Sequence, residues 1–328
     1  MSYIKKTVAI LLLISVLLLS SCSSGKPIES SEDELRVVGT VGEYEVFYEE
    51  LRFILLTYKN TMIDSYGEDY FEDSKNREAA KKHILDEIKY NYAVLQMCRD
   101  VGIERDEQII LEAVQEKVEE TIAELGSRKR YKKYLEENYL TDNLFRFNIL
   151  VDILQNELMY VYTNDLLIIE KDDNAIYDII KNEFIRTQHI YISKSNGKSD
   201  AVNRASIEAA YAELLGGADF MSVADEYGED PDLKSEGFYI LKGYMSESYE
   251  DAAFSLKPDK ISEIIEDEGG FYIIKRLEQD TLYVMLNFET LAERYKYYTF
   301  VEMINDTQKT IDFVPNEYFG SIDLFEIE

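Results

Sequence analysis

Four runs of sequence decide the fold: RTQHIYI (residues 186–192), AELLGGADFMSVADEYGEDP (212–231), GYMSESYEDAAFSLKPDKIS (243–262) and GGFYIIKRLE (269–278). This part of the chain contains short apolar stretches broken by Gly and Asp, and a helical pattern covers residues 199–215. Short apolar stretches between turn residues are typical of β-strands. The pattern therefore predicts a compact α+β unit. Its strands are expected at residues 187–193, 237–241, 262–265 and 271–277.

The sequence on either side of this unit has helical periodicity, and residues 47–183 are predicted to be helical almost throughout. The clearest stripe has alternating spacings of three and four: Leu144, Phe147, Val151, Leu154, Leu158 and Val161. An earlier helix is expected to begin at Asp106, its N-cap, and to stop at Gly126. After residue 279, a strand at residues 282–286 and a helix at 288–307 are expected. The α+β unit is therefore predicted to be inserted into a helical body.

The start of the chain has the features of an export signal. Lys5 and Lys6 precede an apolar stretch at residues 8–19, which is too short to span a bilayer as a permanent helix. The tetrapeptide LSSC (19–22) follows, and it resembles the bacterial lipobox, whose cysteine receives acyl chains. The resemblance implies a lipid anchor on Cys22 at the extracytoplasmic face of a bacterial membrane. An ordinary signal peptide with a chance cysteine is the alternative.

The net charge of the chain limits the kinds of molecule that it can bind. The sequence has 35 basic and 65 acidic residues, and two of the basic ones lie in the leader, so the processed chain carries a net charge of −32. Such a body repels nucleic acid and acidic lipid, which excludes nucleic acid as a partner and leaves the lipid as the membrane attachment. Unfolded or basic client chains would be attracted. Solubility alone is an alternative explanation of the charge.

Several reaction classes lack their signatures. The chain has two histidines, no Cys-x-x-Cys, no Gly-x-Ser-x-Gly and no glycine-rich phosphate loop. The acids of residues 229–236 do not follow calcium-loop spacing, so we expect no metal and no cofactor. Once Cys22 is acylated, Cys98 is the only remaining thiol, and its helical spacing from Ile84, Ile88 and Leu95 predicts a buried structural cysteine.

Taken in order, the four runs resemble the parvulin family of peptidyl-prolyl cis-trans isomerases. The second run resembles the helix pair around a Leu-x-x-Gly-x-Asp-Phe turn, and the third resembles the Gly-x-Met, Glu-x-Ala-Phe and Leu-x-x-x-x-Ile-Ser series. The fourth run matches the closing strand. The resemblance implies a four-stranded antiparallel sheet with helices, and isomerisation of X-Pro bonds without a cofactor.

The resemblance also implies a set of site residues, listed here by role: catalytic His189, Asp230 and Tyr272, and substrate-binding Tyr239, Met245, Tyr249 and Phe254. Met245 and Tyr249 match the family's Met and Phe of the proline pocket. Isomerisation breaks no covalent bond but crosses a barrier of ~18–20 kcal/mol, so an apolar slot with few ionisable groups suits it.

Each of three assignments has a structural alternative. His189 is equally explained as a buried histidine that is hydrogen-bonded to a neighbour. Asp230 is equally explained as a loop acid before Pro231. For Phe254, a place in the core explains the residue at least as well as direct contact with the substrate.

The sequence departs from the family pattern around the site. Tyr272 stands where the family has its second histidine, Asp267 replaces a threonine, and EGFYI (236–240) replaces a Gly-Asp-Leu-Gly strand. These replacements are compatible with weak or absent isomerase activity. They also favour an alternative function, in which a non-catalytic holdase or scaffold uses the parvulin fold to bind peptides.

The flanking segments resemble PrsA- and SurA-type foldases. RVVGTVGEYEVFYEELRFIL (36–55) resembles their opening strand pair and first helix, and CRDVGIERDE (98–107) resembles a junction between helices. The resemblance implies a foldase for exported proteins with X-Pro bonds; monomer and dimer both remain open. The long helical stretch argues against a solute-binding lipoprotein. The predicted domains are a signal peptide (1–21), a tether (22–35), a helical part (36–184), a parvulin-like domain (185–279) and a returning segment (280–328).

Overall fold

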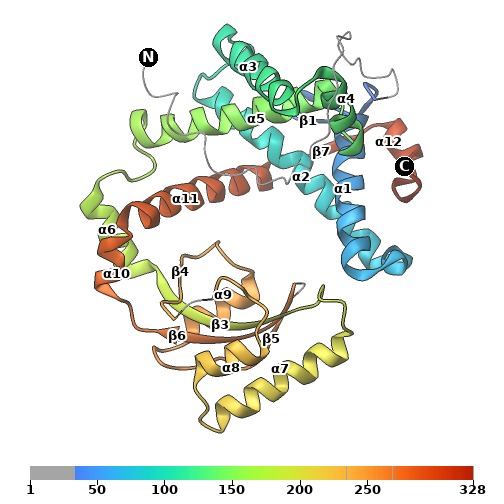
Figure 1. Ribbon diagram of the computed structural model, residues 1–328. Coiled ribbons are helices and arrows are strands. Elements are labelled where there is room, and N and C mark those ends of the chain that lie inside the picture. The colour runs from blue at the N-terminus through green and yellow to red at the C-terminus, as the bar shows by residue number, and fades with distance from the viewer. Residues whose placement is uncertain (1–33, 234, 268, 328) are drawn as a thin grey trace.

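The computed structural model describes residues 34–233, 235–267 and 269–327 (Figure 1). The expected signal peptide and Cys22 lie outside these ranges. Within them the chain forms a large helical body and a smaller α+β domain, drawn at the top and the bottom of Figure 1. The predicted fold class, a helical body with an inserted parvulin-like α+β domain, is confirmed. In the described part of the chain, no helix is both long enough and apolar enough to cross a bilayer.

The helical body is built from both ends of the chain. Its helices are α1 (Tyr48–Tyr66), α2 (Ser74–Asp100), α3 (Gln108–Leu125), α4 (Arg128–Glu137), α5 (Asp142–Tyr160), α6 (Asp173–Glu183), α11 (Phe288–Thr310) and α12 (Glu317–Ser321). Helix α11 returns after the α+β domain and packs along α2. Strand β1 (Val37–Val41) lies between β2 (Tyr44–Phe47) and the late strand β7 (Phe313–Pro315), all antiparallel. Because the two ends share one core, the α+β domain is an insertion.

The predicted apolar stripe forms part of this core. Leu154 and Leu158 of α5 are fully buried, and they join a cluster that includes Leu51 of α1, Ile88 of α2 and Ile304 of α11. Burying such side chains contributes roughly 1.5–3 kcal/mol each. The π-helical turn η2 (Val161–Asp165) ends the stripe.

Two further expectations for the helical body can be compared with the structure. Helix α3 begins one residue later than expected, with Glu107 rather than Asp106 at the N-cap and without a side-chain capping bond. Gly126 ends it in the left-handed region, at φ 82°. Cys98 is 1% exposed, and burial raises the pKa of its thiol to about 12, so it is a structural cysteine.

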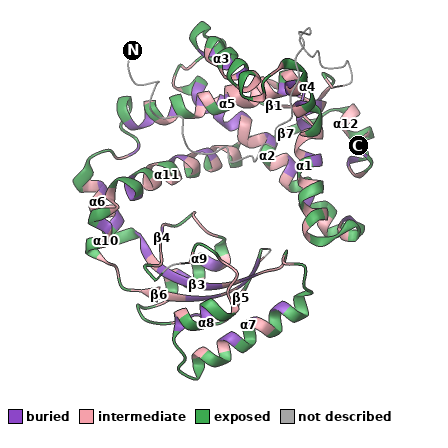
Figure 2. Cartoon of the chain, in the orientation of Figure 1, coloured by how far each residue is buried: buried purple, intermediate pink, exposed green. Residues whose placement is uncertain are grey.

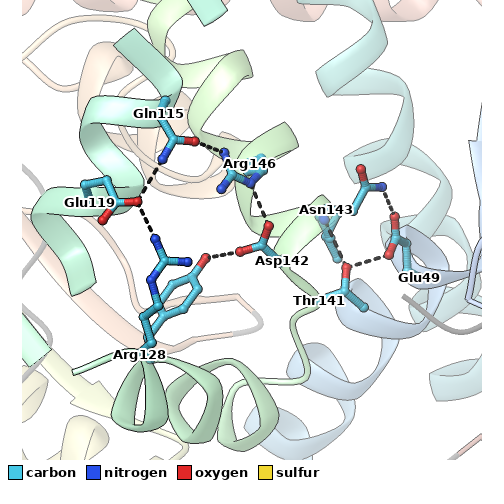
Figure 3. Close-up of polar contacts among 10 residues, drawn as sticks. Glu49, Gln115, Glu119, Arg128, Thr141, Asp142, Asn143 and Arg146 are labelled. Carbon is cyan, nitrogen blue, oxygen red and sulfur yellow. Dashed lines mark hydrogen bonds and ion pairs between the residues drawn. The ribbon is translucent and has the colours of Figure 1, made fainter. Parts of the chain in front are cut away.

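A polar network connects the helices at one end of the body (Figure 3). Asp142, at the start of α5, accepts hydrogen bonds from the Tyr131 hydroxyl of α4 (2.9 Å) and from the Arg146 guanidinium (2.6 Å). Arg146 also donates to Gln115 of α3 (2.8 Å). Glu49 of α1 is 3% exposed and accepts from Thr141 and Asn143. The network therefore links α5 to α3, α4 and α1 by hydrogen bonds in which one partner is charged.

The α+β domain contains one four-stranded antiparallel sheet. Its strands are β3 (Ile185–Ser193), β4 (Phe238–Ile240), β5 (Ile265–Glu266) and β6 (Gly270–Leu277), in the order β4-β3-β6-β5. The central pair, β3 and β6, is in register from Arg186↔Leu277 to Ser193↔Gly270. Of the strand expected at residues 262–265, only Ile265 lies in β5. Ser262 still bonds to β6, because its amide donates to the Ile274 carbonyl (2.7 Å) and its hydroxyl accepts from the Ile274 amide (2.9 Å).

The two faces of this sheet have different coverings. Helices α7 (Asp200–Leu215) and α8 (Phe220–Tyr227) cover one face, where Ile190 and Ile273 are fully buried. Helix α9 (Glu247–Ser255) covers the other face, where Tyr249 packs on Ile185 and Ile274. Figure 2 shows buried residues along the central strands, between the two layers. Because side chains alternate along a strand, each face takes every second residue.

The chain returns to the helical body through a helix rather than a strand. Residues Thr281–Leu286 form α10, so the prediction of a strand at 282–286 was wrong. The Asp280 carboxylate accepts from the Tyr283 amide (3.1 Å) and so caps the helix at its N-terminus. Only Val284 of α10 is fully buried, and it packs on α11.

Candidate active site

The alternation of strand β3 places His189 on the face that α9 covers. Thr187 lies on the same face, and the register aligns Tyr272 of β6 with Tyr191, one position further along that face. The His189 side chain is almost fully buried, at 7% exposed. It therefore needs hydrogen-bond partners inside the domain.

His189 has such a partner at each ring nitrogen. Its Nε2 lies 2.8 Å from Oδ2 of Asp230, and its Nδ1 lies 3.1 Å from the Tyr249 hydroxyl. A carboxylate can only accept, so the proton of the neutral ring is on Nε2, and Nδ1 accepts from Tyr249. The Tyr249 hydroxyl then accepts from Thr187, at 3.2 Å. Four side chains thus form one directed chain of hydrogen bonds from Thr187 to Asp230.

Burial fixes the protonation states in this chain. Desolvation lowers the pKa of His189, although its hydrogen bond and charge interaction with Asp230 act in the opposite direction. The imidazole is therefore neutral at neutral pH. Desolvation also raises the pKa values of Tyr249 and Tyr272 well above the usual tyrosine value, so both phenols keep their protons.

This protonation state predicts a pH dependence of stability. Because the native pKa of His189 is lowered, the unfolded chain, with a histidine pKa of roughly 6.5, takes up its proton first as the pH falls. The contribution of the buried neutral His189 to the free energy of unfolding is present above about pH 6.5 and is lost progressively below it. We expect the midpoint of thermal unfolding of the α+β domain to fall more between pH 7 and pH 5 in wild type than in His189→Gln. Equal shifts in the two proteins would contradict a neutral buried His189.

Aromatic rings enclose His189 on three sides. The Phe238 ring is stacked on it, with centroids 5.1 Å apart and an interplanar angle of 12°. Tyr249 and Tyr272 present T-shaped contacts at 5.7 and 5.9 Å. The sequence reasoning missed Phe238 and Thr187. The β3–β4 register pairs these two residues directly, so strand pairing is the signal that could have found them.

The predicted substrate-binding residues Met245, Tyr249 and Phe254 belong to one apolar cluster. Tyr249 is fully buried in it, whereas Met245 and Phe254 are partly buried and pack against it. The Met245 amide donates to the Glu250 carboxylate (2.9 Å), which fixes the loop before α9. Partly exposed Met245 beside aromatic rings is a suitable wall for a proline ring.

Tyr239 does not join the other predicted site residues. It pairs with Arg186, and strand alternation turns it to the sheet face opposite His189. Its ring stacks on Tyr283 of α10 (4.9 Å), and its hydroxyl accepts from the Asp280 amide (2.7 Å). The structure therefore does not bring Tyr239 together with His189. Tyr239 joins the domain to the returning segment, and its neighbour Phe238 lies beside His189 instead.

Asp267, which replaces the family's threonine, organises the turn before β6. Its Oδ1 accepts from the amides of Gly269 (2.8 Å) and Gly270 (3.0 Å), and its Oδ2 accepts from the Ser246 hydroxyl (2.7 Å). The replacement therefore ties the turn to the start of α9. Among the described residues, no three metal-ligating side chains gather in a metal-binding arrangement.

Models of two known protein families match segments of this chain. A family model described as the PPIC-type PPIase domain matches residues 184–278. Residues 184–278 form a parvulin-type peptidyl-prolyl isomerase domain. A model of the SurA-like N-terminal domain matches residues 1–159. These two matches within the chain confirm the resemblance that the sequence motifs indicated.

Individual relatives of this chain are named as foldases or chaperones. The chain is 26% identical over 266 residues to a foldase protein PrsA of Caldanaerobacter subterraneus subsp. tengcongensis, covering 78% of this chain and 77% of that protein. It is 24% identical over 227 residues to a chaperone SurA of Nitrosospira multiformis, covering 63% of this chain and 50% of that protein. A crystal structure of PrsA from Bacillus anthracis has a TM-score of 0.36 and 20% identity, covering 67% of this chain and 94% of that one. The sequence relatives support a folding factor with a parvulin domain.

Proposed function

We propose that this protein is a lipid-anchored foldase that isomerises X-Pro bonds in unfolded exported proteins. The observation that carries the proposal is the joining of Met245 and Tyr249 in one apolar cluster of a parvulin domain, where the Tyr249 hydroxyl is hydrogen-bonded to the buried His189. The relatives named foldase and chaperone support the same class of function.

The site acts through solvent exclusion rather than covalent chemistry. In the twisted amide the nitrogen loses its double-bond character, and the barrier of ~18–20 kcal/mol is mainly the cost of that loss. An apolar wall at Met245 holds the proline ring and removes water from the amide, which favours the less charge-separated twisted state. The phenol of Tyr272, which remains protonated, can donate a hydrogen bond that holds the substrate carbonyl in one orientation while the C–N bond rotates.

His189 acts as a positioning residue in this proposal. Both of its ring nitrogens already have partners within the domain, Tyr249 and Asp230. The ring therefore orients the Tyr249 side chain at the base of the slot and holds the Asp230 loop. This role agrees with the structural alternative that the sequence left open.

The proposed location is the extracytoplasmic face of a bacterial membrane, with acyl chains on Cys22. The supporting features are Lys5 and Lys6, the apolar stretch at residues 8–19 and the tetrapeptide LSSC. Two or more acyl chains on one residue give stable anchoring. Anchoring raises the local concentration of a weak binder where exported chains emerge.

Refolding of a client whose slow phase is proline isomerisation tests this function. We expect the full chain to accelerate that phase and Met245→Ala to accelerate it much less, because the apolar wall is shortened. Met221→Ala is a matched control, since Met221 is also partly exposed in the same domain but lies on α8, at the other face of the sheet. An unchanged slow phase with the wild-type chain would contradict the isomerase function.

A non-catalytic holdase is the second candidate, favoured by the replacement of the family's second histidine with Tyr272. This candidate expects the chain to suppress client aggregation without accelerating the slow phase. Replacing residues 185–279 by a short linker then locates the binding surface. Unchanged protection would place client binding on the helical body, and lost protection would place it on the parvulin domain.

A further inference from the structure

Helix α11 of the helical body contacts the loop that carries Met245. Arg294 donates a hydrogen bond to the backbone oxygen of Tyr239 (2.9 Å), and its guanidinium lies 5.2 Å from the ring centroid of Tyr244. One turn further along α11, the Tyr298 ring meets the Tyr244 ring in a T-shaped contact, with centroids 4.9 Å apart and an angle of 84°. Residues four apart on a helix share one face. Arg294 and Tyr298 therefore form a single contact surface.

The contacted loop connects β4 to α9 and includes one wall of the proposed proline pocket. Inside the domain, the Glu250 carboxylate accepts from the amides of Gly243 (3.0 Å) and Met245 (2.9 Å). Tyr244, between these two residues, directs its ring to α11 instead. The domain's own carboxylate thus holds the loop backbone, and the helical body holds the side chain that immediately precedes Met245.

We propose that Arg294 and Tyr298 are positioning residues for the isomerase site, so that the helical body orders the Met245 wall of the proline pocket. The proposal rests on the proposed function. Both residues lie outside the segments that match the PPIC-type and SurA-like domains. The chain therefore completes its pocket with a helix that follows the isomerase domain in sequence.

The expected kinetic effect follows from this role. Neither side chain needs to touch the substrate, so their loss lowers the fraction of molecules with an ordered loop. The apparent affinity for the substrate falls in proportion to that fraction. At saturating substrate, the bound peptide itself keeps the loop ordered. Loss of both contacts is therefore expected to raise KM and to leave kcat nearly unchanged.

The experiment compares full-length variants in an X-Pro peptide assay. Arg294→Ala combined with Tyr298→Leu is expected to raise KM about threefold to tenfold, with kcat within about twofold of wild type. Tyr298→Phe keeps the ring and is expected to retain the wild-type KM. Glu293→Ala, at an exposed position on the same helix, is the control. The fold should persist because α11 enters the cores of the molecule through other residues, including Leu291, Phe300 and Ile304.

Hydrogen exchange gives a second measurement that needs no activity. The amides of Gly243 and Met245 are expected to exchange faster in the double variant, whereas those of β3 and β6 keep their wild-type rates. Unchanged exchange at both amides, or faster exchange with an unchanged KM, would overturn the proposal. If the wild-type chain shows no isomerase activity, the proposed function fails, and the exchange rates alone decide whether α11 positions the loop.

Discussion

Met245→Ala is expected to lower kcat/KM for X-Pro peptides by about 30-fold. Alanine removes three heavy atoms from the wall that would contact the proline ring. At about 0.8 kcal/mol for each methylene-sized group the full effect is about 2.4 kcal/mol, and because Met245 is only partly buried we expect roughly 2 kcal/mol. The side chain is only partly buried, so the domain should remain folded. Steady-state kinetics on a short X-Pro peptide measures the effect.

Met221→Ala separates this effect from a general loss of packing. It makes the same change in the same domain, on helix α8, behind the opposite face of the sheet. We expect its kcat/KM to stay within about twofold of wild type. Equal losses in the two variants would remove Met245 from the pocket.

Cys22→Ser is expected to abolish acylation completely. The acyl chains are proposed to attach to this sulfur, and a serine hydroxyl does not replace it. Metabolic labelling with an alkyne fatty acid, followed by detection on the purified chain, measures the change. Cys98→Ser is the matched control because Cys98 is the chain's other cysteine and is buried.

The labelling pattern decides whether the anchor exists. Wild type and Cys98→Ser should carry the label, and Cys22→Ser should not. Label that persists in Cys22→Ser, or that is absent from wild type, would contradict the lipid anchor on Cys22.

Motifs and periodicity predicted the architecture well because they depend on local sequence. The stripe through Leu154 and Leu158 was sufficient to predict α5 and its buried face. Strand alternation likewise requires His189 and Thr187 to share a face of the sheet. The insertion of the α+β domain followed from helical patterns on both of its sides.

The features that the sequence did not predict depend on strand pairing and helix capping. Tyr239 and Phe238 are neighbours in sequence, and only the pairing of Phe238 with Thr187 decides which of them faces His189. Register is a tertiary property that a short strand such as β4 does not specify alone. The segment expected as a strand at residues 282–286 is a helix, and the Asp280 carboxylate caps it.

The contact between α11 and the Met245 loop was also beyond the sequence. Tyr244 and Tyr298 are far apart in the chain, and neither has a motif that links them. Tyrosine is common in this protein, with 26 copies, so composition gives no reason to select this pair. Only the packed arrangement of the two parts of the chain brings their rings together.

The rate of cis–trans exchange in an X-Pro peptide, measured by exchange NMR with and without the full chain, tests the isomerase function most directly. The uncatalysed exchange takes tens of seconds or longer at 25 °C, so even weak catalysis is visible against it. We expect the wild-type chain to accelerate exchange in proportion to its concentration, and Met245→Ala to lose most of that acceleration. Exchange at the uncatalysed rate, even with the wild-type chain in excess over the peptide, would contradict an active isomerase site.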